Sequence, residues 1–227
     1  MCGRYTLRPR GSAKFYGLPA SELPFFVPRY NIAPSQEVPV IVASGAGREI
    51  ALFQWGLVPS WNKEPKGFIN ARAETLEEKP SFSESFQRRR CLIPADGFYE
   101  WKRNGNLRQP YFFQMEDEGP FAFAGIWDKW QGIGVTITSC AIITTTPNEL
   151  LATIHDRMPA ILNPEAQERW LRQDALPAEL KTLLVPFPGS GMKGFPVSPR
   201  VNSPDADGAN LVEEVEIRQE PTTELLF

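Results

Sequence analysis

The chain has 227 residues, of which 42% are hydrophobic and 22% are charged. This balance is typical of a globular protein and excludes a disordered or fibrous one, and the length suffices for one sizeable domain. No apolar run reaches the roughly 18 residues that cross a membrane, and the start, MCGRYTLRPRG, lacks the apolar stretch of a secretory signal. We therefore expect a cytoplasmic protein that has no membrane partner.

The cysteines and the histidine restrict the metal and redox chemistry open to the chain. Cys2, Cys91 and Cys140 are too few and too scattered for a disulfide framework, and no CxxC pair indicates zinc. His155 is the single histidine, so multi-histidine metal sites are excluded. The sequence predicts no metal, no cofactor and a reducing compartment.

The net charge of −3 conceals an asymmetry between the two halves of the chain. Residues 1–110 carry 16 Lys and Arg against 10 Asp and Glu, whereas residues 111–227 carry 8 against 17. Nucleic-acid binding depends on a local basic surface and not on the total charge. The distribution is compatible with a nucleic-acid partner, although random fluctuation explains it equally well.

The 22 prolines and 17 glycines favour short strands joined by turns. In chain order, alternation and composition predict strands at Val38–Val42 and Ile50–Trp55, a helix at Ser83–Arg89, strands at Gly97–Lys102, Tyr111–Met115, Phe121–Trp127 and Val135–Thr145, and helices at Pro164–Arg172 and Pro177–Leu184. Asn104-Gly105 predicts a hairpin turn.

The remaining segments predict irregular structure. Ser198–Asn210 has the composition of a loop, and the end from Arg218 that of a poorly ordered tail. We expect a single α+β domain with a mostly antiparallel, barrel-like β core and peripheral helices.

Cys2 becomes a 1,2-aminothiol if Met1 is trimmed, which is usual before a small side chain. The reference pKa values, about 7.7–8.0 for an α-amine and 8.5 for a thiol, make both groups partly nucleophilic near neutrality. An aldehyde would form an imine with the amine, and the thiolate would then close a thiazolidine ring that resists hydrolysis. Gly3 permits close approach to this nucleophile. The alternative is that a cysteine at this position has no function.

Asn70-Ala71-Arg72-Ala73-Glu74-Thr75 places polar groups directly after an apolar pair. The amide of Asn70 can donate and accept, which suits holding an amine or a sugar hydroxyl. The guanidinium of Arg72 could grip a phosphate. The competing interpretation is the start of a helix capped by Asn70.

Cys91–Trp101, with the sequence CLIPADGFYEW, places Glu100 between Tyr99 and Trp101. A carboxylate among aromatic side chains is costly to desolvate, so its pKa is raised, as a general acid–base near neutrality requires. An exposed glutamate on an edge strand is an equally good interpretation. We expect Cys91 and Cys140 to be buried small hydrophobic residues.

His155-Asp156-Arg157-Met158-Pro159 predicts a rigid polar surface loop, the kind of segment that often carries a site. A lone histidine is as often structural as catalytic, so both roles remain open. Basic and aromatic residues also interleave in the amino-terminal half, where cations could hold a nucleic-acid backbone and rings could stack on bases. They are Arg4, Arg8, Arg10, Arg29, Trp55, Trp61, Arg72 and Arg88–Arg90, of which Trp55 is expected in the core.

Together these motifs resemble the SOS response-associated peptidase (SRAP) family, which shields abasic sites. The matching segments, in order over about residues 2–203, are MCGRY, WGLVPSW at 55–61, NARAET at 70–75, CLIPADGFYEW at 91–101, HDRMP at 155–159, and FPVS and VN at 195–202. The resemblance implies a SRAP-like domain at 1–210 and leaves 211–227 as a C-terminal extension.

The resemblance implies that Cys2 crosslinks to DNA and that Asn70, Glu100 and His155 complete the active site. It implies that Arg4 and Arg72 contact phosphate, and we group Trp61, Trp101 and Thr144 with these DNA contacts, Thr144 also as a residue that positions His155. It implies single-stranded DNA or single-strand/double-strand junctions as partner. We expect a monomer that is nucleoid-associated when bound.

Three other functions remain open on the sequence. The first is an amino-terminal-nucleophile amidotransferase, although Arg4 replaces the apolar residue expected after Gly3 and no room remains for an acceptor domain. The second is a peptidase that pairs Cys2 with His155. The third is a non-covalent single-strand binding module in which Cys2 is incidental.

Overall fold

The computed structural model describes residues 2–8, 12–45, 47–105 and 107–217, and its strands fall into two sheets. The strands are β1 (Tyr5–Leu7), β2 (Arg29–Ile32), β3 (Glu37–Ser44), β4 (Gly47–Trp55), β5 (Asn70–Arg72), β6 (Arg90–Ala95), β7 (Gly97–Asn104), β8 (Leu107–Met115), β9 (Phe121–Gly132), β10 (Val135–Thr145), β11 (Met158–Pro159), β12 (Ile161–Leu162) and β13 (Met192–Pro196). The helices are α1 (Ser12–Phe15), α2 (Ser83–Arg88), α3 (Pro164–Leu171) and α4 (Pro177–Thr182).

The larger sheet closes into a barrel. Its strands follow the order β10-β4-β3-β6-β9, and β9 pairs with β10 along its whole second half, which closes the ring. Neighbouring barrel strands are antiparallel except β4 and β10, which are parallel. Closure leaves the wall without an open edge, because every strand finds a hydrogen-bonding partner on both sides.

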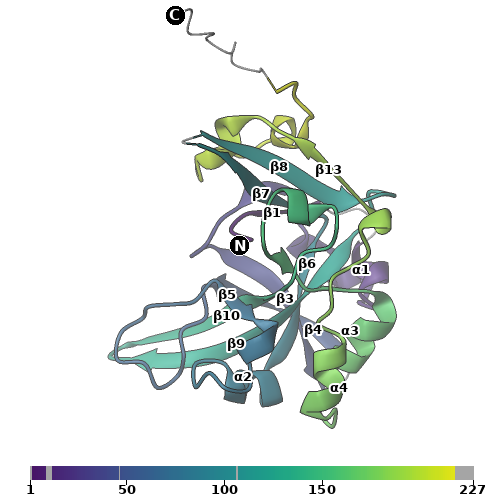
Figure 1. Ribbon diagram of the computed structural model, residues 1–227. Helices are drawn as coiled ribbons and strands as arrows, with labels where there is room; N and C mark the ends of the chain where they lie inside the picture. Colours follow the sequence, from purple (N-terminus) through teal and green to yellow (C-terminus); the bar gives the residue numbers. More distant parts are fainter. Residues whose placement is uncertain (1, 9–11, 46, 106, 218–227) are drawn as a thin grey trace, which may run out of the picture.

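The second sheet has the order β13-β8-β7-β1-β2. In Figure 1, β7, β8 and β13 lie above β5, β9 and β10. Tyr5 of β1 directs its ring edge-on against Trp55 and Phe123 of the barrel, with ring centroids 5.3 and 5.7 Å away. β1 is therefore hydrogen-bonded to one sheet and packed into the core of the other. This places the start of the chain at the junction of the two sheets.

Arg90, at the start of β6, is almost fully buried and joins the ends of two helices. Its guanidinium donates to the carbonyls of Phe86 (2.8 Å) and Gln87 in α2, and to those of Trp170 (2.9 Å) and Arg172 (2.6 Å) at the end of α3. The last carbonyls of a helix lack partners within the helix and carry partial negative charge. One buried cation therefore caps α2 and α3 against the barrel.

We expect Arg90→Met to lower the free energy of unfolding by about 3 kcal/mol or more, because it leaves several buried carbonyls without a hydrogen-bond donor. Urea unfolding followed by circular dichroism measures this loss. The control is Arg88→Met, since Arg88 is exposed two residues earlier, and it should stay within about 0.5 kcal/mol of the parent. Equal midpoints for the two variants would show that Arg90 is not a cap.

The predicted elements are present in the structure. Each of the six predicted strands lies within an observed strand, and the three predicted helices are observed one or two residues shorter. The expected α+β class with a mostly antiparallel barrel is confirmed. Trp55, Cys91 and Cys140 are buried as predicted. None of the helices in the described ranges is long and apolar enough to cross a membrane.

The hairpin turn lies one residue later than predicted. Asn104 still pairs with Leu107, so Asn104 ends β7 and the turn begins at Gly105. Gly105 takes up the positive φ of +58° that such a turn requires. Asn106 falls outside the described residues. The prediction of a turn was correct, but its position was wrong because the strand pairing extends further along β7.

The predicted loop Ser198–Asn210 contains no strand and includes short 3-10 turns at Pro199–Asn202 and from Ala209. Beyond it, Leu211 is buried, and the backbone N–H of Val215 donates to the carbonyl of Pro196 at 3.0 Å. The first residues after 210 therefore pack on β13. The domain boundary at 210 stays a prediction, and the tail expected from Arg218 lies outside the described residues.

Candidate active site

The amino-terminal segment is held in place by a buried carboxylate at the corner between β6 and β7. Asp96 accepts a hydrogen bond from the Thr6 hydroxyl at 2.6 Å and forms an ion pair with Arg8. Its backbone N–H donates to the Thr6 carbonyl at 3.1 Å. Gly97 follows because a Cβ there would overlap the ring of Phe112. β1 is therefore fixed on both sides, and Cys2 continues from it.

Cys2 lies at this fixed end, and its side chain is fully buried in the chain that still carries Met1. Its Sγ lies 3.9 Å from the Arg4 carbonyl, which accepts its hydrogen bond. Burial raises the pKa of the thiol well above its usual range, and the negative charge of Glu100 adds to this shift. The sequence-based expectation of a partly ionised thiol near neutrality is therefore wrong for this state. The thiol must lose its proton during the reaction.

Glu100 is on β7, an interior strand of its sheet, and is 1% exposed. Tyr5 pairs with Phe98, and the Tyr99 N–H donates to the Arg4 carbonyl at 3.0 Å. Extending this antiparallel register places Glu100 opposite Gly3, next to Cys2. Burial raises the pKa of Glu100, while the amino-terminal charge and His155 act in the opposite direction. The edge-strand interpretation is wrong, and the predicted upward shift is confirmed.

Asn70 reaches the same place from the barrel. β5 pairs in parallel with β10, with Asn70 opposite Ile142. The side-chain Nδ2 of Asn70 donates to the Cys2 carbonyl at 2.9 Å. Its Oδ1 is buried and has no hydrogen-bond partner among the described residues. Asn70 is in a strand and does not cap a helix, so the helix-cap interpretation is wrong.

His155 lies on the loop before β11, and β11 pairs with the end of β10. Its Nε2 is 4.0 Å from Oε2 of Glu100. Its Nδ1 accepts the backbone N–H of Arg157 at 3.0 Å, and Asp156 Oδ1 lies 2.9 Å from the same nitrogen. The structure therefore brings Cys2, Asn70, Glu100 and His155 together from both sheets, and their catalytic roles stay predictions.

Thr144 is fully buried between β5 and β11. Its Oγ1 lies 3.5 Å from the Ala71 carbonyl, and its own carbonyl accepts Nη2 of Arg157 at 2.6 Å. Its contact with Arg157 fits the positioning of the His155 loop, and its grouping with the DNA contacts stays a prediction.

Arg4 is engaged within the protein. Its Nη1 donates to Asn31 Oδ1 at 3.1 Å and to the Val201 carbonyl at 2.7 Å, and its Nη2 to the Asn202 carbonyl at 3.4 Å. These bonds tie the amino-terminal segment to residues almost 200 positions later. The described contacts thus give Arg4 a structural role, and a phosphate contact by Arg4 stays a prediction.

Arg72 and the two tryptophans have side chains that reach the surface. Arg72 is exposed on β5, two residues after Asn70. Trp61 is 61% exposed, and its Nε1 donates to the Pro80 carbonyl at 3.4 Å. Trp101 is partly exposed, and its Nε1 donates to Asn202 Oδ1 at 2.7 Å. By contrast, Arg8 and Arg90 are buried on protein partners and cannot hold a nucleic acid.

Sequence analysis did not identify Asp96, Glu74 and Arg157 as residues that hold the segments of the candidate site in place. All three stand within the quoted motifs, where a charged residue among apolar neighbours was the available signal.

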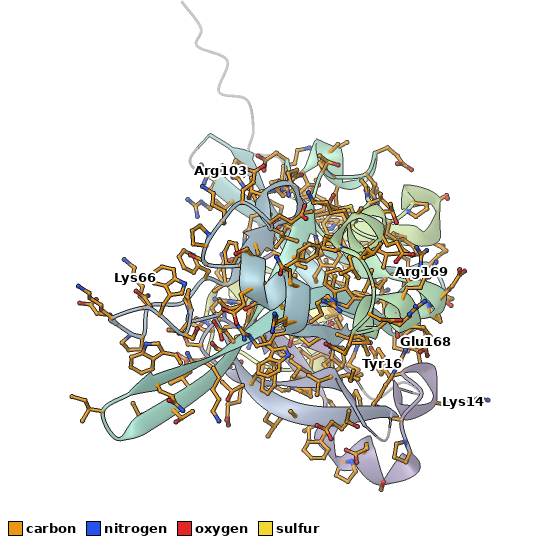
Figure 2. The ribbon with its side chains drawn as sticks, turned by 90° about the horizontal axis from the view of Figure 1, so that it is seen from below. Lys14, Tyr16, Lys66, Arg103, Glu168 and Arg169 are labelled. Carbon is orange, nitrogen blue, oxygen red and sulfur yellow. The ribbon has the colours of Figure 1, made fainter. Side chains whose placement is uncertain are left out.

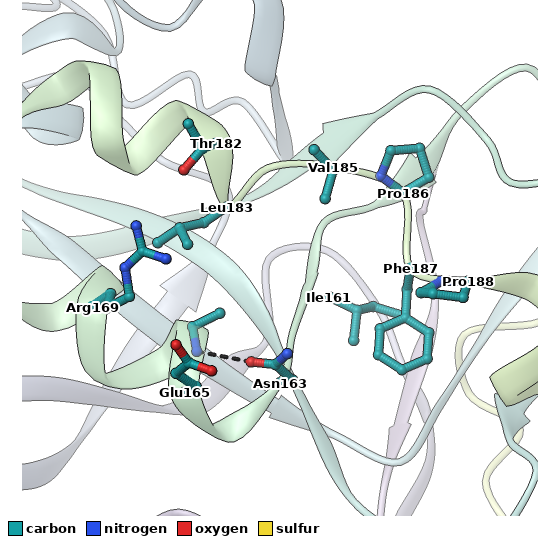
Figure 3. A pocket seen from close by; sticks show the side chains of 11 residues that line it. Ile161, Asn163, Glu165, Arg169, Thr182, Leu183, Val185, Pro186, Phe187 and Pro188 are labelled. Atoms are coloured by element: carbon teal, nitrogen blue, oxygen red, sulfur yellow. Dashed lines mark hydrogen bonds between the residues drawn. The ribbon is translucent and has the colours of Figure 1, made fainter.

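No group of three or more His, Cys, Asp or Glu side chains that could hold a metal occurs in the described ranges. A hollow of about 220 Å³ beside α3 and α4 (Figure 3), lined by Asn163, Arg169 and Phe187 among others, contains none of the candidate catalytic residues.

A family model described as SOS response associated peptidase (SRAP) matches residues 1–204. The chain belongs to the SRAP family. All four candidate catalytic residues and the surrounding motifs fall within the matched range, whereas residues after 204 lie outside it.

SRAP relatives match the chain over nearly its whole length. YoqW of Bacillus subtilis is 42% identical over 227 residues, covering 94% of this chain and 99% of YoqW. YedK of Escherichia coli is 30% identical, covering 95% of this chain and all of YedK. HMCES of the mouse is 34% identical and extends further, since the match spans 78% of this chain and 62% of HMCES. All three are named abasic site processing proteins.

Solved structures show the same SRAP fold. A protein of Bacteroides thetaiotaomicron has a TM-score of 0.76 and 33% identity over 82% of this chain and 85% of its own. A protein of Bordetella bronchiseptica has a TM-score of 0.75 and 25% identity over 87% of this chain and all of its own.

Proposed function

We propose that this SRAP protein shields abasic sites in single-stranded DNA by a covalent thiazolidine bond through Cys2, once Met1 has been removed. The names of relatives that match it from end to end support a role in abasic site processing. The observation that carries the chemistry is the convergence at Cys2. Asn70 from the barrel holds its carbonyl, and Glu100 from the second sheet lies beside its thiol.

The first step joins the Cys2 amine to the aldehyde carbon of the ring-opened abasic sugar. The amine nitrogen bonds to that carbon, the carbonyl oxygen leaves as water, and an imine remains. The free Oδ1 of Asn70 is available to accept an N–H of the amine and so to aim its lone pair. Glu100, with its raised pKa, takes the proton that the amine must lose.

The second step closes the ring. Sγ of Cys2 bonds to the former aldehyde carbon, its proton passes by way of Glu100, and the imine nitrogen becomes a protonated ring amine. Because burial keeps the thiol neutral, a base beside it is needed at this step. His155 acts earlier, since its imidazole can protonate the ring oxygen of the closed sugar and expose the aldehyde. The same groups run the reverse reaction, so Glu100 also supports release of the adduct.

Arg72, Trp61 and Trp101 are the proposed DNA contacts. Arg72 would hold a phosphate, and the exposed faces of the tryptophans would stack on bases next to the lesion. We propose a monomer that acts in the cytoplasm, prefers single strands or single-strand/double-strand junctions, and is nucleoid-associated when bound. Any proteolysis by this chain, in our proposal, goes no further than the loss of Met1.

The test is a denaturing gel with an oligonucleotide that carries one abasic site, run beside an intact-mass measurement that reports whether Met1 is gone. Trimmed protein should shift the lesion strand permanently after boiling in detergent, and an undamaged strand should run free. Glutamine hydrolysis would favour an amidotransferase, and cleavage of an unrelated substrate a peptidase. A lesion strand that stays unshifted with fully trimmed protein contradicts the proposal.

We expect Arg72→Gln to lower the salt dependence of DNA capture, because each lost phosphate contact lowers the slope of log affinity against log salt by about one. Binding of a single strand without a lesion, followed by fluorescence anisotropy over a salt series, measures the slope. Lys14→Gln is the matched control, because it also removes one exposed positive charge. Figure 2 shows Lys14 on the opposite side of the molecule from Lys66, a residue that precedes Asn70 by four positions in the chain. An unchanged slope removes Arg72 from the DNA surface.

A further inference from the structure

We propose that Arg157 and Glu74 are positioning residues that decide which nitrogen of His155 carries the proton. The value of this arrangement for catalysis rests on the proposed function, whereas the arrangement itself can be tested without DNA. Neither residue reaches the reacting atoms, so they act through the imidazole.

The guanidinium of Arg157 is hydrogen-bonded to two neighbouring parts of the fold, Glu74 and β10. Its Nη1 and Nη2 donate to Oε1 and Oε2 of Glu74 at 2.7 and 2.9 Å, a paired geometry that fixes the plane of the guanidinium. Nη2 also donates to the Thr144 carbonyl on β10 at 2.6 Å. Arg157 is 9% exposed, so water competes little for these bonds. The pKa of Glu74 is lowered, chiefly by its hydrogen bonds from Arg157, which keeps the carboxylate charged.

These hydrogen bonds fix the backbone at residue 157 as well as the Arg157 side chain. The backbone N–H of Arg157 donates to Nδ1 of His155 at 3.0 Å. A nitrogen that accepts a hydrogen bond has no proton of its own. The neutral ring therefore carries its proton on Nε2, and Nε2 lies 4.0 Å from Oε2 of Glu100. The proton of His155 is thus directed to the side where Cys2 and Glu100 meet.

Asp156 competes for the same ring nitrogen. Its Oδ1 lies 2.9 Å from Nδ1, a distance that would suit a proton on Nδ1. The Asp156 side chain is 86% exposed, however, so water satisfies its carboxylate without the imidazole. Glu100 on β7 and Asp156 on its own loop are charged groups near the ring. We assign the neutral ring to the Arg157 bond and the protonated ring to a bond with Asp156 that replaces it.

Alternation between these two bonds suits a residue that gives up a proton and regains it. When the ring is charged, Nδ1–H faces Asp156 and Nε2–H faces the substrate. When the ring is neutral, the Arg157 N–H holds Nδ1 and keeps the remaining proton on Nε2. His155 then stays in one orientation through the cycle, because the loop is held by Arg157 in both states.

The presence of a single histidine makes the test direct. In protein labelled with ¹⁵N, the two imidazole nitrogens give one unambiguous pair of signals. At a pH above the titration seen in the same spectra, we expect a protonated Nε2, a bare Nδ1, and a scalar coupling across the hydrogen bond between Nδ1 and the Arg157 amide nitrogen. A neutral ring protonated on Nδ1 would overturn the proposal.

The variants are Glu74→Gln and Arg157→Lys, each of which removes the paired geometry. We expect the coupling to Nδ1 to vanish in both, with signals of a mixed tautomer, while Asp156→Asn keeps the wild-type spectrum of the neutral ring. If either variant fails to fold, the coupling measured in the wild type still shows which nitrogen of His155 carries the proton. A wild-type spectrum from folded Glu74→Gln, or a lost coupling in Asp156→Asn, contradicts the assignment.

The rate of crosslink formation is a second measurement, and it links the positioning of His155 to the reaction. Crosslink formation should slow by about 10- to 100-fold in Glu74→Gln, as expected for a misplaced catalytic group, and the pH profile of the rate should change. A slower rate with an unchanged profile would indicate a structural role alone. Absence of crosslinking by the wild type would refute the proposed function, while the tautomer measurement would remain valid.

Discussion

We expect an alanine inserted between Met1 and Cys2 to abolish the heat-stable adduct. Methionine is still trimmed before alanine, but the free amine then belongs to the alanine, and the nitrogen of Cys2 is locked in a peptide bond. An amide nitrogen forms no imine, so the thiol has no carbon on which to close a five-membered ring. The measurement is the fraction of lesion strand shifted on a denaturing gel, with intact mass confirming the new first residue.

Two further variants separate the amine from the thiol. Cys2→Ser keeps the amine and should give an imine that borohydride traps, but no adduct that survives heating. Cys91→Ala removes a thiol that is fully buried in the barrel, and below its melting temperature it should crosslink as the parent does. A heat-stable adduct from the extended protein or from the serine variant would contradict the ring mechanism.

Glu100→Gln should slow crosslink formation by about 10²- to 10⁴-fold, the usual loss when a general acid–base is removed. Glutamine keeps the size of the side chain but cannot take a proton from the amine or from Sγ. In the parent, burial raises the pKa of Glu100 above its ordinary value, so the rate should fall as the pH drops through that raised pKa. The glutamine variant should lack this acidic limb. Single-turnover kinetics over a pH series measure both effects.

Stability provides the control for folding. A carboxyl group whose pKa is raised in the folded state stabilises the protein when protonated, and this contribution is lost as the pH rises through the folded pKa. At a pH above the raised pKa the parent therefore carries an unfavourable buried charge, and there Glu100→Gln should melt at a higher temperature. The difference should shrink as the pH falls. A variant that is both slower and less stable at a pH above the raised pKa would indicate a damaged fold, not a missing base.

The strands that sequence analysis found are those whose apolar residues alternate or run together over five or more positions, as in β4, β8 and β10. Sequence analysis missed β6, whose apolar run contains Pro94. It also missed the short strands β1, β2, β5, β11, β12 and β13, which are two to five residues long. Their pattern is too short to show a period. They are strands because barrel and sheet supply hydrogen-bonding partners from far along the chain, such as Thr144 opposite Arg72.

The sequence by itself determined the motifs and the fold class, because these depend on residue type and local order. The assignment of Cys2, Asn70, Glu100 and His155 as catalytic residues came from the resemblance to the SRAP family and stays a prediction. The sequence also predicted that the pKa of Glu100 is raised, since aromatic neighbours on the same strand desolvate it.

Only the tertiary structure decided how these groups act. Burial between the two sheets raises the pKa of the Cys2 thiol, Arg4 is bound to carbonyls near residue 200, and the carbonyl of fully buried Thr144 accepts a hydrogen bond from Arg157. The nitrogen of His155 that carries the proton follows from the grip of Glu74 on Arg157, 83 residues apart in the chain. Burial and hydrogen-bond direction arise from contacts between distant segments, and no local pattern encodes them.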